Sequence, residues 1–353
     1  MSVRRVVTVG AALVAASLAL AGCGQAPEGG DDGAQAEVCA RMVTNSGGLE
    51  DRSFNQSSWE GLQQAEEEYG IEAEALVSTA ETDLEPNVQQ AVDSGCELIV
   101  TVGYELAQAT LDQAEANPDL AFAIVDEVVE AENVKPVVFD TAQASFLAGY
   151  LAAGVSKTGM VATFGGGNQP PVTLFMDGFV DGVAQYNEVH GTQVRALGWD
   201  KEAQDGAFTG DFEDVNKGKV LTEGFIDQGA DVILPVAGQV GEGAAAAALE
   251  RGATSIIWVD SDGYDTLPEQ YRAVLLTSVL KNTQQAMVEI VGDVVDDSFT
   301  NEPYIGTLEN GGVEIAPYHD LESLVPPELQ GEIEGVRQSI IAGELVVESP
   351  STP

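Results

Sequence analysis

The sequence is poor in the side chains that most enzymes use for catalysis. Its 353 residues include only two histidines, His190 and His319, and three cysteines, and none of these is spaced as a zinc or iron ligand set. The phosphate-binding pattern G-x-x-x-x-G-K-[ST] is absent, and the glycine-rich turn at 238–243 is not ordered as the dinucleotide-binding G-x-G-x-x-G. These absences predict a protein that is not an enzyme and that needs no metal or cofactor.

Three short patterns imitate the elements of penicillin-recognising serine enzymes. They are S-x-x-K at 278–281, SDG at 261–263 and KTG at 157–159. Their order along the chain is reversed, and the second pattern lacks its asparagine. A hydrolase is therefore the weakest of the functional hypotheses.

Basic residues are also scarce. Lysine and arginine number 14 against 58 acidic residues, which gives a formal net charge of −44. A surface so negative repels phosphate backbones, so we expect no nucleic-acid partner, and it disfavours an anionic ligand unless the site is locally basic. The same charge is typical of adaptation to salt, so it does not identify a partner by itself.

The N-terminus reads as a secretory signal. Arg4 and Arg5 precede an apolar stretch at 6–21 that is too short to span a bilayer, and LAGC at 20–23 resembles a bacterial lipobox. We expect a signal peptide at 1–22, lipidation of Cys23 and a flexible, polar tether at 23–36. The protein would then be anchored by lipid on the extracytoplasmic face of the cell membrane. The alternative is an ordinary signal peptide with a chance cysteine.

Short β-branched runs alternate with helical stretches through the rest of the chain. Strands are predicted at 37–43, 73–77, 98–102, 121–125, 137–139, 160–164, 193–198, 232–235, 255–259 and 273–277. Helices are predicted at 53–69, 85–93, 105–117, 142–156, 174–190, 241–251 and 327–342. This βαβα alternation with apolar strands predicts an α/β fold whose parallel sheets are covered on both faces.

The chain length favours two such sheets in two doubly wound, Rossmann-like lobes joined by crossing hinge strands. We expect lobe 1 at 37–140, with a return near 279–310. Lobe 2 is expected at 141–278 together with the C-terminal segment. A single larger sheet is the alternative.

Two cysteines remain after Cys23. Cys39 and Cys96 each lie at the start of a predicted strand, and an extracytoplasmic compartment permits disulfides. If the strands are neighbours in a parallel sheet, the thiols lie at the same edge and can bridge. Otherwise they are two small buried hydrophobic residues.

Polar and aromatic residues gather where the predicted strands end. They occupy 45–55 after the first strand, 103–104 after the third, and positions 126, 165–171, 237–243 and 260–262 after later ones. Ligands of open α/β sheets bind outside the carboxyl ends of the strands. The sequence therefore predicts a binding pocket at these loops.

Motifs in these loops resemble one known family, the basic membrane proteins. The likeness begins with VTNSGGLEDRSFNQSSWEG at 43–61 and continues in TVGY at 101–104, FAIVD at 122–126, QASFLAGYLAA at 143–153 and SKTG at 156–159. Further on it includes GFVDG at 178–182, GADVILPVAG at 229–238, VDSD at 259–262 and TSVLK at 277–281. The resemblance implies a type I periplasmic-binding fold and a lipoprotein receptor that delivers purine nucleosides to the permease and ATPase of an ABC transporter. We expect it to work as a monomer.

The matched residues suit the two faces and the edge of a purine base. Phe54 and Phe175 are the candidates for stacking on the base, one from each lobe. Asn45 and Asn55 are the candidates for reading the base edge, because amides both donate and accept hydrogen bonds. The alternatives are core aromatic residues for the phenylalanines and turn or helix-start positions for the asparagines.

Other matched residues suit the sugar. Asp126 and Asp260 end strands and can accept hydrogen bonds from ribose hydroxyls, although capping of the next helix is the alternative. Lys281 can donate to the sugar or brace a carboxylate, unless it is a solvated surface lysine. Gly238 would let the backbone approach the ligand closely.

The sequence departs from the family pattern at two positions, with Asn45 and Glu50 where the family usually has aspartate. A carboxylate can only accept a hydrogen bond, whereas an amide can present either its oxygen or its NH₂ group. We therefore expect a broader or shifted base preference that admits adenosine more easily. A receptor for a sugar or another neutral solute, and a lipoprotein that binds a partner protein, are the alternative functions.

Overall fold

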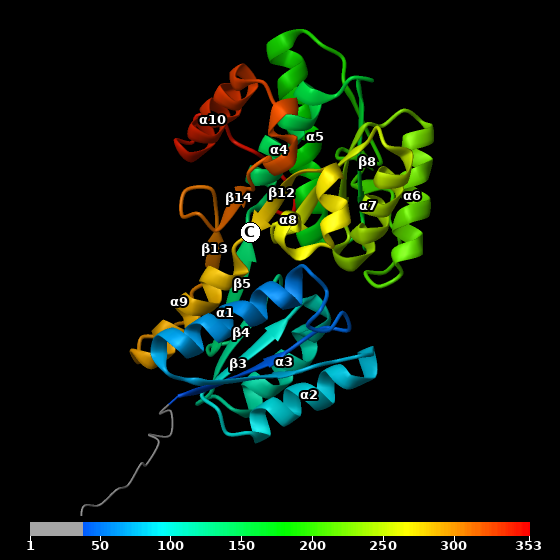
Figure 1. The fold of residues 1–353 in the computed structure, drawn as a ribbon. Coiled ribbons are helices and arrows are strands. Elements are labelled where there is room, and N and C mark those ends of the chain that lie inside the picture. The colour runs from blue at the N-terminus through cyan, green and yellow to red at the C-terminus, as the bar shows by residue number, and fades with distance from the viewer. Residues whose placement is uncertain (1–37) are drawn as a thin grey trace, which may run out of the picture. The chain divides into compact units, whose positions relative to one another are not determined.

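Two six-stranded sheets organise the part of the chain that the computed structural model describes, residues 38–353 (Figure 1). The first sheet is parallel throughout, in the order β13-β5-β4-β3-β1-β2. Its strands are β1 Cys39–Val43, β2 Glu72–Leu76, β3 Leu98–Val102, β4 Ala121–Val125, β5 Val134–Phe139 and β13 Tyr304–Gly306. The expected signal peptide, lipidated Cys23 and tether lie outside the described residues.

The second sheet has the order β14-β12-β11-β10-β6-β7, and only β14 runs antiparallel to its neighbour. Its strands are β6 Met160–Gly165, β7 Arg195–Leu197, β10 Val232–Val236, β11 Ser255–Asp260, β12 Leu275–Lys281 and β14 Val313–Ile315. The short strands β8 Trp199–Asp200 and β9 Asp205–Gly206 form a separate antiparallel pair. The predicted α/β fold with two predominantly parallel sheets is confirmed.

Helices cover both faces of each sheet because the strands bury side chains on both faces. The first sheet carries α1 Phe54–Tyr69 and α9 Thr283–Val295 on one face, and α2 Glu81–Asp93 and α3 Ala107–Ala116 on the other. The second sheet carries α4 Thr141–Val155 and α5 Pro170–His190 on one face, and α6 Val215–Asp227 and α7 Gly241–Arg251 on the other. The remaining helices are α8 Gly263–Thr266 and α10 Pro327–Ile341, with 3₁₀ turns η1 Tyr104–Leu106, η2 Gly238–Val240, η3 Glu269–Val274 and η4 His319–Leu324. Within residues 38–353, no helix is both long enough and apolar enough to cross a membrane.

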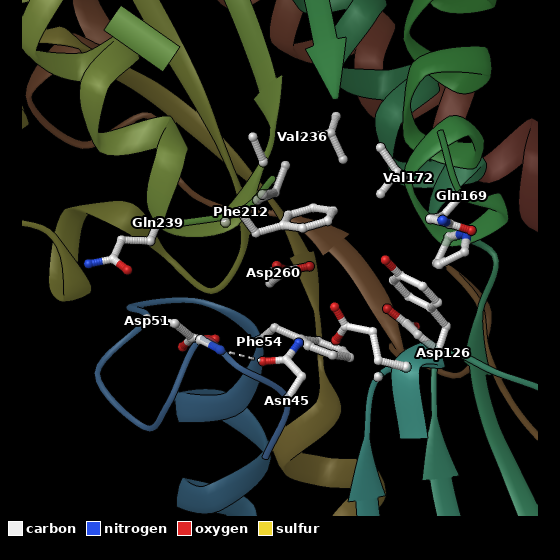
Figure 2. A pocket seen from close by; sticks show the side chains of 18 of the residues that line it. Asn45, Asp51, Phe54, Asp126, Gln169, Val172, Phe212, Val236, Gln239 and Asp260 are labelled. Atoms are coloured by element: carbon white, nitrogen blue, oxygen red, sulfur yellow. Dashed lines mark hydrogen bonds between the residues drawn. The ribbon is translucent and has the colours of Figure 1, made fainter. Parts of the chain in front are cut away.

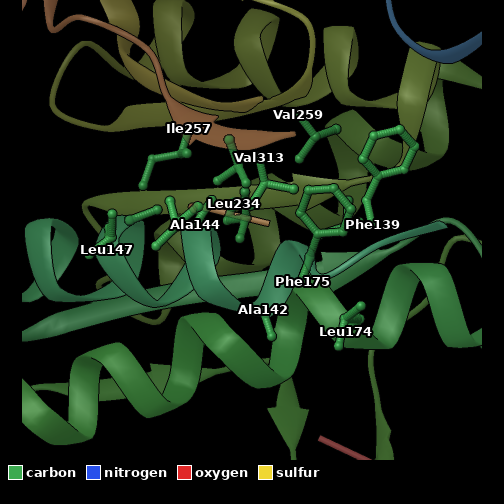
Figure 3. Close-up of a cluster of buried hydrophobic side chains, with 14 of the residues drawn as sticks. Phe139, Ala142, Ala144, Leu147, Leu174, Phe175, Leu234, Ile257, Val259 and Val313 are labelled. Carbon is green, nitrogen blue, oxygen red and sulfur yellow. The ribbon is translucent and has the colours of Figure 1, made fainter. Parts of the chain in front are cut away.

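Helices α4 and α5 pack closely through glycines. A Cβ atom at Gly149 would lie 2.0 Å from the carbonyl oxygen of Phe179, and one at Gly182 would lie 2.0 Å from that of Phe146. Figure 3 shows the apolar cluster that this helix pair forms with the second sheet, in which Phe139 and Phe175 lie near one another. This closely packed pair supports the floor of the site described below.

The chain passes from the first sheet to the second after β5, returns after β12 and crosses again after β13. The crossing segments bond to one another: Asp140 N donates to Gly306 O at 2.8 Å, and Asn282 N donates to Gly312 O at 2.9 Å. We propose that the sheets are the cores of two lobes, lobe 1 at 37–140 with a return near 279–310, and lobe 2 at 141–278 with the C-terminal segment. The strand membership supports this division except at the return. Strand β12 stays in the second sheet up to Lys281, so the chain returns to the first sheet at residue 282.

Several elements differ from the sequence-based prediction. Helices α6, α8 and α9 and the strand pair β8–β9 were not predicted, and α2 and α5 each begin four residues earlier than predicted. Strand β12 was predicted at 273–277 but runs from Leu275 to Lys281. The start of that prediction fails because residues 269–274 form the 3₁₀ turn η3. Cys39 and Cys96 are joined by a disulfide between the beginning of β1 and the approach to β3, which are neighbouring strands.

Candidate functional site

A cavity lies between the carboxyl ends of the two sheets. About 790 Å³ of empty space lies between its walls, including the open solvent at its mouth. Its wall combines loops that follow β1, β3 and β4 of the first sheet with the ends of β10, β11 and β12 of the second. The predicted residues in this wall are Asn45, Phe54, Asp126, Phe175, Gly238, Asp260 and Lys281.

A buried lysine links the two sheets at the bottom of the cavity. Lys281 is only 3% exposed, and its Nζ lies 2.5 Å from Asp126 Oδ2 and 3.5 Å from Asp260 Oδ1. Asp126 follows a strand of the first sheet, whereas Asp260 and Lys281 end strands of the second. Burial alone would lower the pKa of Lys281, but the two carboxylates outweigh it and raise that pKa above its ordinary value. The lysine is therefore charged and holds both acceptors in place.

The two carboxylates share an uncommon backbone conformation. Asp126 has φ 62° and Asp260 has φ 67°, both in the left-handed region that few non-glycine residues adopt. Such conformations gather at functional sites, where the surrounding structure holds them. Asp260 also accepts a hydrogen bond from Ser53 Oγ, which comes from the first sheet's side of the cavity. Each carboxylate is thus aimed by its backbone and fixed by a partner across the cavity.

Three aromatic rings surround the lysine, and two of them, Phe54 and Phe175, were predicted to stack on a ligand. The Nζ of Lys281 lies 5.1 Å from the ring centroid of Phe54, 5.3 Å from that of Phe175 and 5.8 Å from that of Phe139. Phe175 lines the cavity but is only 1% exposed, so almost none of its ring is open for stacking. We propose that it packs beside the buried cation in place of stacking on a ligand.

Phe212 is a further aromatic ring in the cavity wall, and the sequence-based prediction did not name it. It is half-buried, lines the cavity from the segment before α6, and faces Phe54 from the opposite wall (Figure 2). Its ring packs on Gly166, where a Cβ atom would lie 2.3 Å from Phe212 Cε1. The prediction missed this residue because it lies in an acidic loop that follows no strand of the two large sheets. The available signal was an aromatic residue set between two acidic ones, Asp211 and Glu213, in a polar loop.

Asn45 and Asn55 are bonded to each other, but only Asn45 lines the cavity. Asn55 Nδ2 donates to Asn45 Oδ1 at 2.7 Å and to Asp51 Oδ2 at 3.0 Å. Asn45 Oδ1 also accepts from Gly47 N at 3.0 Å, so this oxygen is engaged twice. The remaining Nδ2 group of Asn45 is turned toward the cavity in Figure 2. The structure thus places Asn55 behind Asn45, where it orients that side chain, and not in the wall as predicted.

Further polar residues enter the wall that the prediction had not singled out. Asp51 accepts from the backbone N–H groups of Ser53, Asn55 and Gln56, which fixes the start of α1. Glu105 and Glu213 bring two more carboxylates. Gly238, which was predicted, opens η2 at the cavity with φ 50°. The conformational freedom of glycine is needed at that last position. Within residues 38–353, no cluster of three or more histidine, cysteine or acidic side chains is arranged to hold a metal ion.

Two parallel α/β sheets joined by crossing segments, with a cavity between their strand ends, define the class of two-lobed solute-binding proteins. Solved structures of the same fold include an ABC transporter solute-binding protein from Aeropyrum pernix K1, with a TM-score of 0.77 and 24% identity over 88% of this chain and 94% of that one. Another, from Conexibacter woesei DSM 14684, has a TM-score of 0.70 and 20% identity over 88% and 99% of the two chains.

The model of the family described as ABC transporter substrate-binding protein PnrA-like matches residues 39–351, and the chain belongs to this family of extracytoplasmic binding proteins. The ABC transporter nucleoside-binding protein BmpA of Lactococcus lactis subsp. cremoris is 28% identical, covering 98% of this chain and 99% of its own length. Basic membrane protein B of Borrelia garinii subsp. bavariensis is 30% identical over 72% of this chain and 73% of its own length. The resemblance to the basic membrane proteins is thereby confirmed, and the chain is a substrate-binding protein and not an enzyme.

Proposed function

We propose that this protein captures a purine nucleoside outside the cell membrane and delivers it to the permease and ATPase subunits of an ABC importer. The observation that carries the proposal is the group of Asp126, Asp260 and Lys281, buried at the bottom of a cavity with aromatic walls. The name of the Lactococcus relative, a nucleoside-binding protein, supports the same ligand class.

The sugar of the ligand would lie against the buried ionic group. Ribose hydroxyls donate hydrogen bonds to the carboxylates of Asp126 and Asp260, and Lys281 donates to a hydroxyl oxygen. Hydrogen bonds to charged groups are the stronger ones, worth about 1.5–3 kcal/mol each. Since the three groups already hold one another, little reorganisation accompanies binding.

The base would lie between Phe54 and Phe212, which come from opposite walls of the cavity. Aromatic stacking on a base is worth about 1–3 kcal/mol when measured by alanine substitution. Asn45 would face the edge of the base. Closure of the two lobes about the crossing segments would exclude water from the bound ligand. We propose that the protein works as a monomer held at the membrane by a lipid on Cys23.

The position of the Phe212 ring can be tested through the glycine beneath it. Gly166→Ala places a methyl group against the ring, so the ring must move, and we expect affinity for the ligand to fall by about tenfold or more, as for Phe212→Ala. Gly167→Ala is the matched control, because its Cβ atom would be 3.5 Å from Phe212 Cε2, an ordinary contact. Isothermal titration of the three variants checks this. Equal affinity of Gly166→Ala and Gly167→Ala would contradict the stacking role.

Native mass spectrometry of the protein purified from its expression host tests the ligand class. We expect an adduct with the mass of a purine nucleoside that disappears after unfolding and refolding. A receptor for sugars remains the alternative, because glucose-galactose-binding GanP from Geobacillus stearothermophilus shares the fold at a TM-score of 0.58. An adduct with the mass of a hexose would favour that alternative.

A further inference from the structure

One carboxylate in the cavity wall lacks a partner. Glu105 belongs to η1, directly after β3, and its Oε2 atom is buried with no hydrogen-bond partner among the described residues. Burial raises the pKa of Glu105, and the nearby carboxylates of Glu213 and Glu81 raise it further. An unsatisfied buried carboxylate oxygen is unfavourable, so this oxygen in the cavity wall is an acceptor open to a ligand.

A hydrogen-bond donor stands on the neighbouring segment. Asn45 Nδ2 is the free half of an amide whose oxygen is held by Asn55 and Gly47. It approaches the loop that carries Glu105, because a Cβ atom built on Gly103 would lie 3.3 Å from it. The cavity therefore presents a donor and an acceptor from adjoining pieces of chain.

A donor beside an acceptor is the pairing that the edge of a purine base requires. Adenine carries the N1 acceptor beside the N6 amino donor, whereas guanine and hypoxanthine carry the O6 acceptor beside the N1–H donor. In adenine the N1 acceptor can bond Asn45 Nδ2–H while the N6 amino group bonds the Glu105 carboxylate. Guanine and hypoxanthine present the two groups in the opposite order, so only their N1–H or their O6 can meet its partner in the same pose. This inference rests on the proposed function. We propose that Glu105 determines specificity by requiring an N–H donor on the base, and that Asn45 donates a hydrogen bond to the neighbouring acceptor of the same base.

The fixed direction of the Asn45 amide accounts for the presence of asparagine at position 45, where the family usually has aspartate. A carboxylate at this position would keep the bonds from Asn55 and Gly47 through one oxygen and turn a second acceptor toward the ligand. Two neighbouring acceptors would then face the N1 atom of adenosine, which is itself an acceptor. Asparagine at position 45 removes that repulsion.

The role of Glu105 is tested by comparing the affinities for adenosine and purine riboside. Purine riboside is adenosine without its amino group, so its base has no N–H donor. We expect the wild-type protein to bind adenosine about tenfold or more tightly, because purine riboside leaves the Glu105 carboxylate unpaired. In Glu105→Leu the two ligands should bind within about twofold of each other. Glu105→Gln, which keeps a neutral acceptor, should give an intermediate ratio.

Glu81→Gln is the matched control. It removes a carboxylate that acts on Glu105 through space but does not line the cavity, so we expect the wild-type ratio. The melting temperature of ligand-free Glu105→Leu should not fall, since the variant removes an unpaired buried charge; a merely structural residue would lower it. Asn45→Asp should weaken adenosine binding by about tenfold or more.

The outcomes separate this inference from the proposed function. Binding of neither adenosine nor purine riboside would overturn the nucleoside assignment itself. Equal binding of both ligands by the wild-type protein, or a ratio that survives in Glu105→Leu, would overturn only the role of Glu105. Unchanged adenosine affinity in Asn45→Asp would overturn the role of its donor partner.

Discussion

Replacing Lys281 by methionine is expected to abolish measurable nucleoside binding and to lower the free energy of unfolding by about 3–5 kcal/mol. The substitution keeps much of the side-chain volume but leaves Asp126 and Asp260 as two buried, mutually repelling carboxylates. It also removes the cation beside the rings of Phe54 and Phe175. Denaturant unfolding and isothermal titration measure the two effects.

Lys135→Met is the matched control. Lys135 is also buried, at 7% exposed, and pairs with Asp293 at 3.2 Å, but it lies outside the cavity wall. We expect it to lose stability while keeping the wild-type affinity. If Lys281→Met fails to fold, the double variant Lys281→Met with Asp126→Asn reduces the uncompensated charge and should fold without binding. Retained affinity in either Lys281 variant would show that the ionic group does not hold the sugar.

Adenosine 5′-monophosphate is expected to bind at least about 100-fold more weakly than adenosine. The charged residues in the cavity wall are one cation, Lys281, and five carboxylates: Asp51, Asp126, Glu105, Glu213 and Asp260. The cation is already engaged by two of the carboxylates. A phosphate would therefore enter a site with an excess of like charge, and desolvating it would be unfavourable.

The reason for this discrimination is testable with a neutral ligand of similar bulk, 5′-deoxy-5′-methylthioadenosine. We expect it to bind within about tenfold of adenosine, since it adds volume at the same position without adding charge. Competition against a bound fluorescent nucleoside measures all three ligands. If both 5′-substituted compounds are excluded equally, the site rejects them by shape, and the electrostatic argument is wrong.

The sequence predicted most of the fold because the strands are short, apolar and evenly spaced. The bounds of β3 and β4 match the predicted 98–102 and 121–125 residue for residue. Helix α9 and the end of β12 could not be located by the same reasoning. There the chain returns to the first sheet at residue 282, and that crossing depends on long-range packing of α9 against α1 and not on a local pattern.

The candidate site was predictable to the extent that its residues follow strands. Asp126 and Asp260 were found because the carboxyl ends of parallel strands meet at one edge. Phe212 was not, because its position depends on a contact with Gly166, 46 positions earlier in the sequence. The hydrogen bond from Asn55 Nδ2 to Asn45 Oδ1 could not be predicted either. Which end of the Asn45 amide faces the cavity depends on the groups that surround it in the folded protein.

The nucleoside assignment is tested most directly by isothermal titration of the wild-type protein with adenosine, guanosine, inosine, D-galactose and D-xylose. We expect the three nucleosides to bind at one site with a dissociation constant of about 1 μM or less, and the two sugars to give no heat of binding. Binding of a sugar, or of none of the five compounds, would contradict the assignment of a cavity that holds a ribose against Lys281 and a base between Phe54 and Phe212.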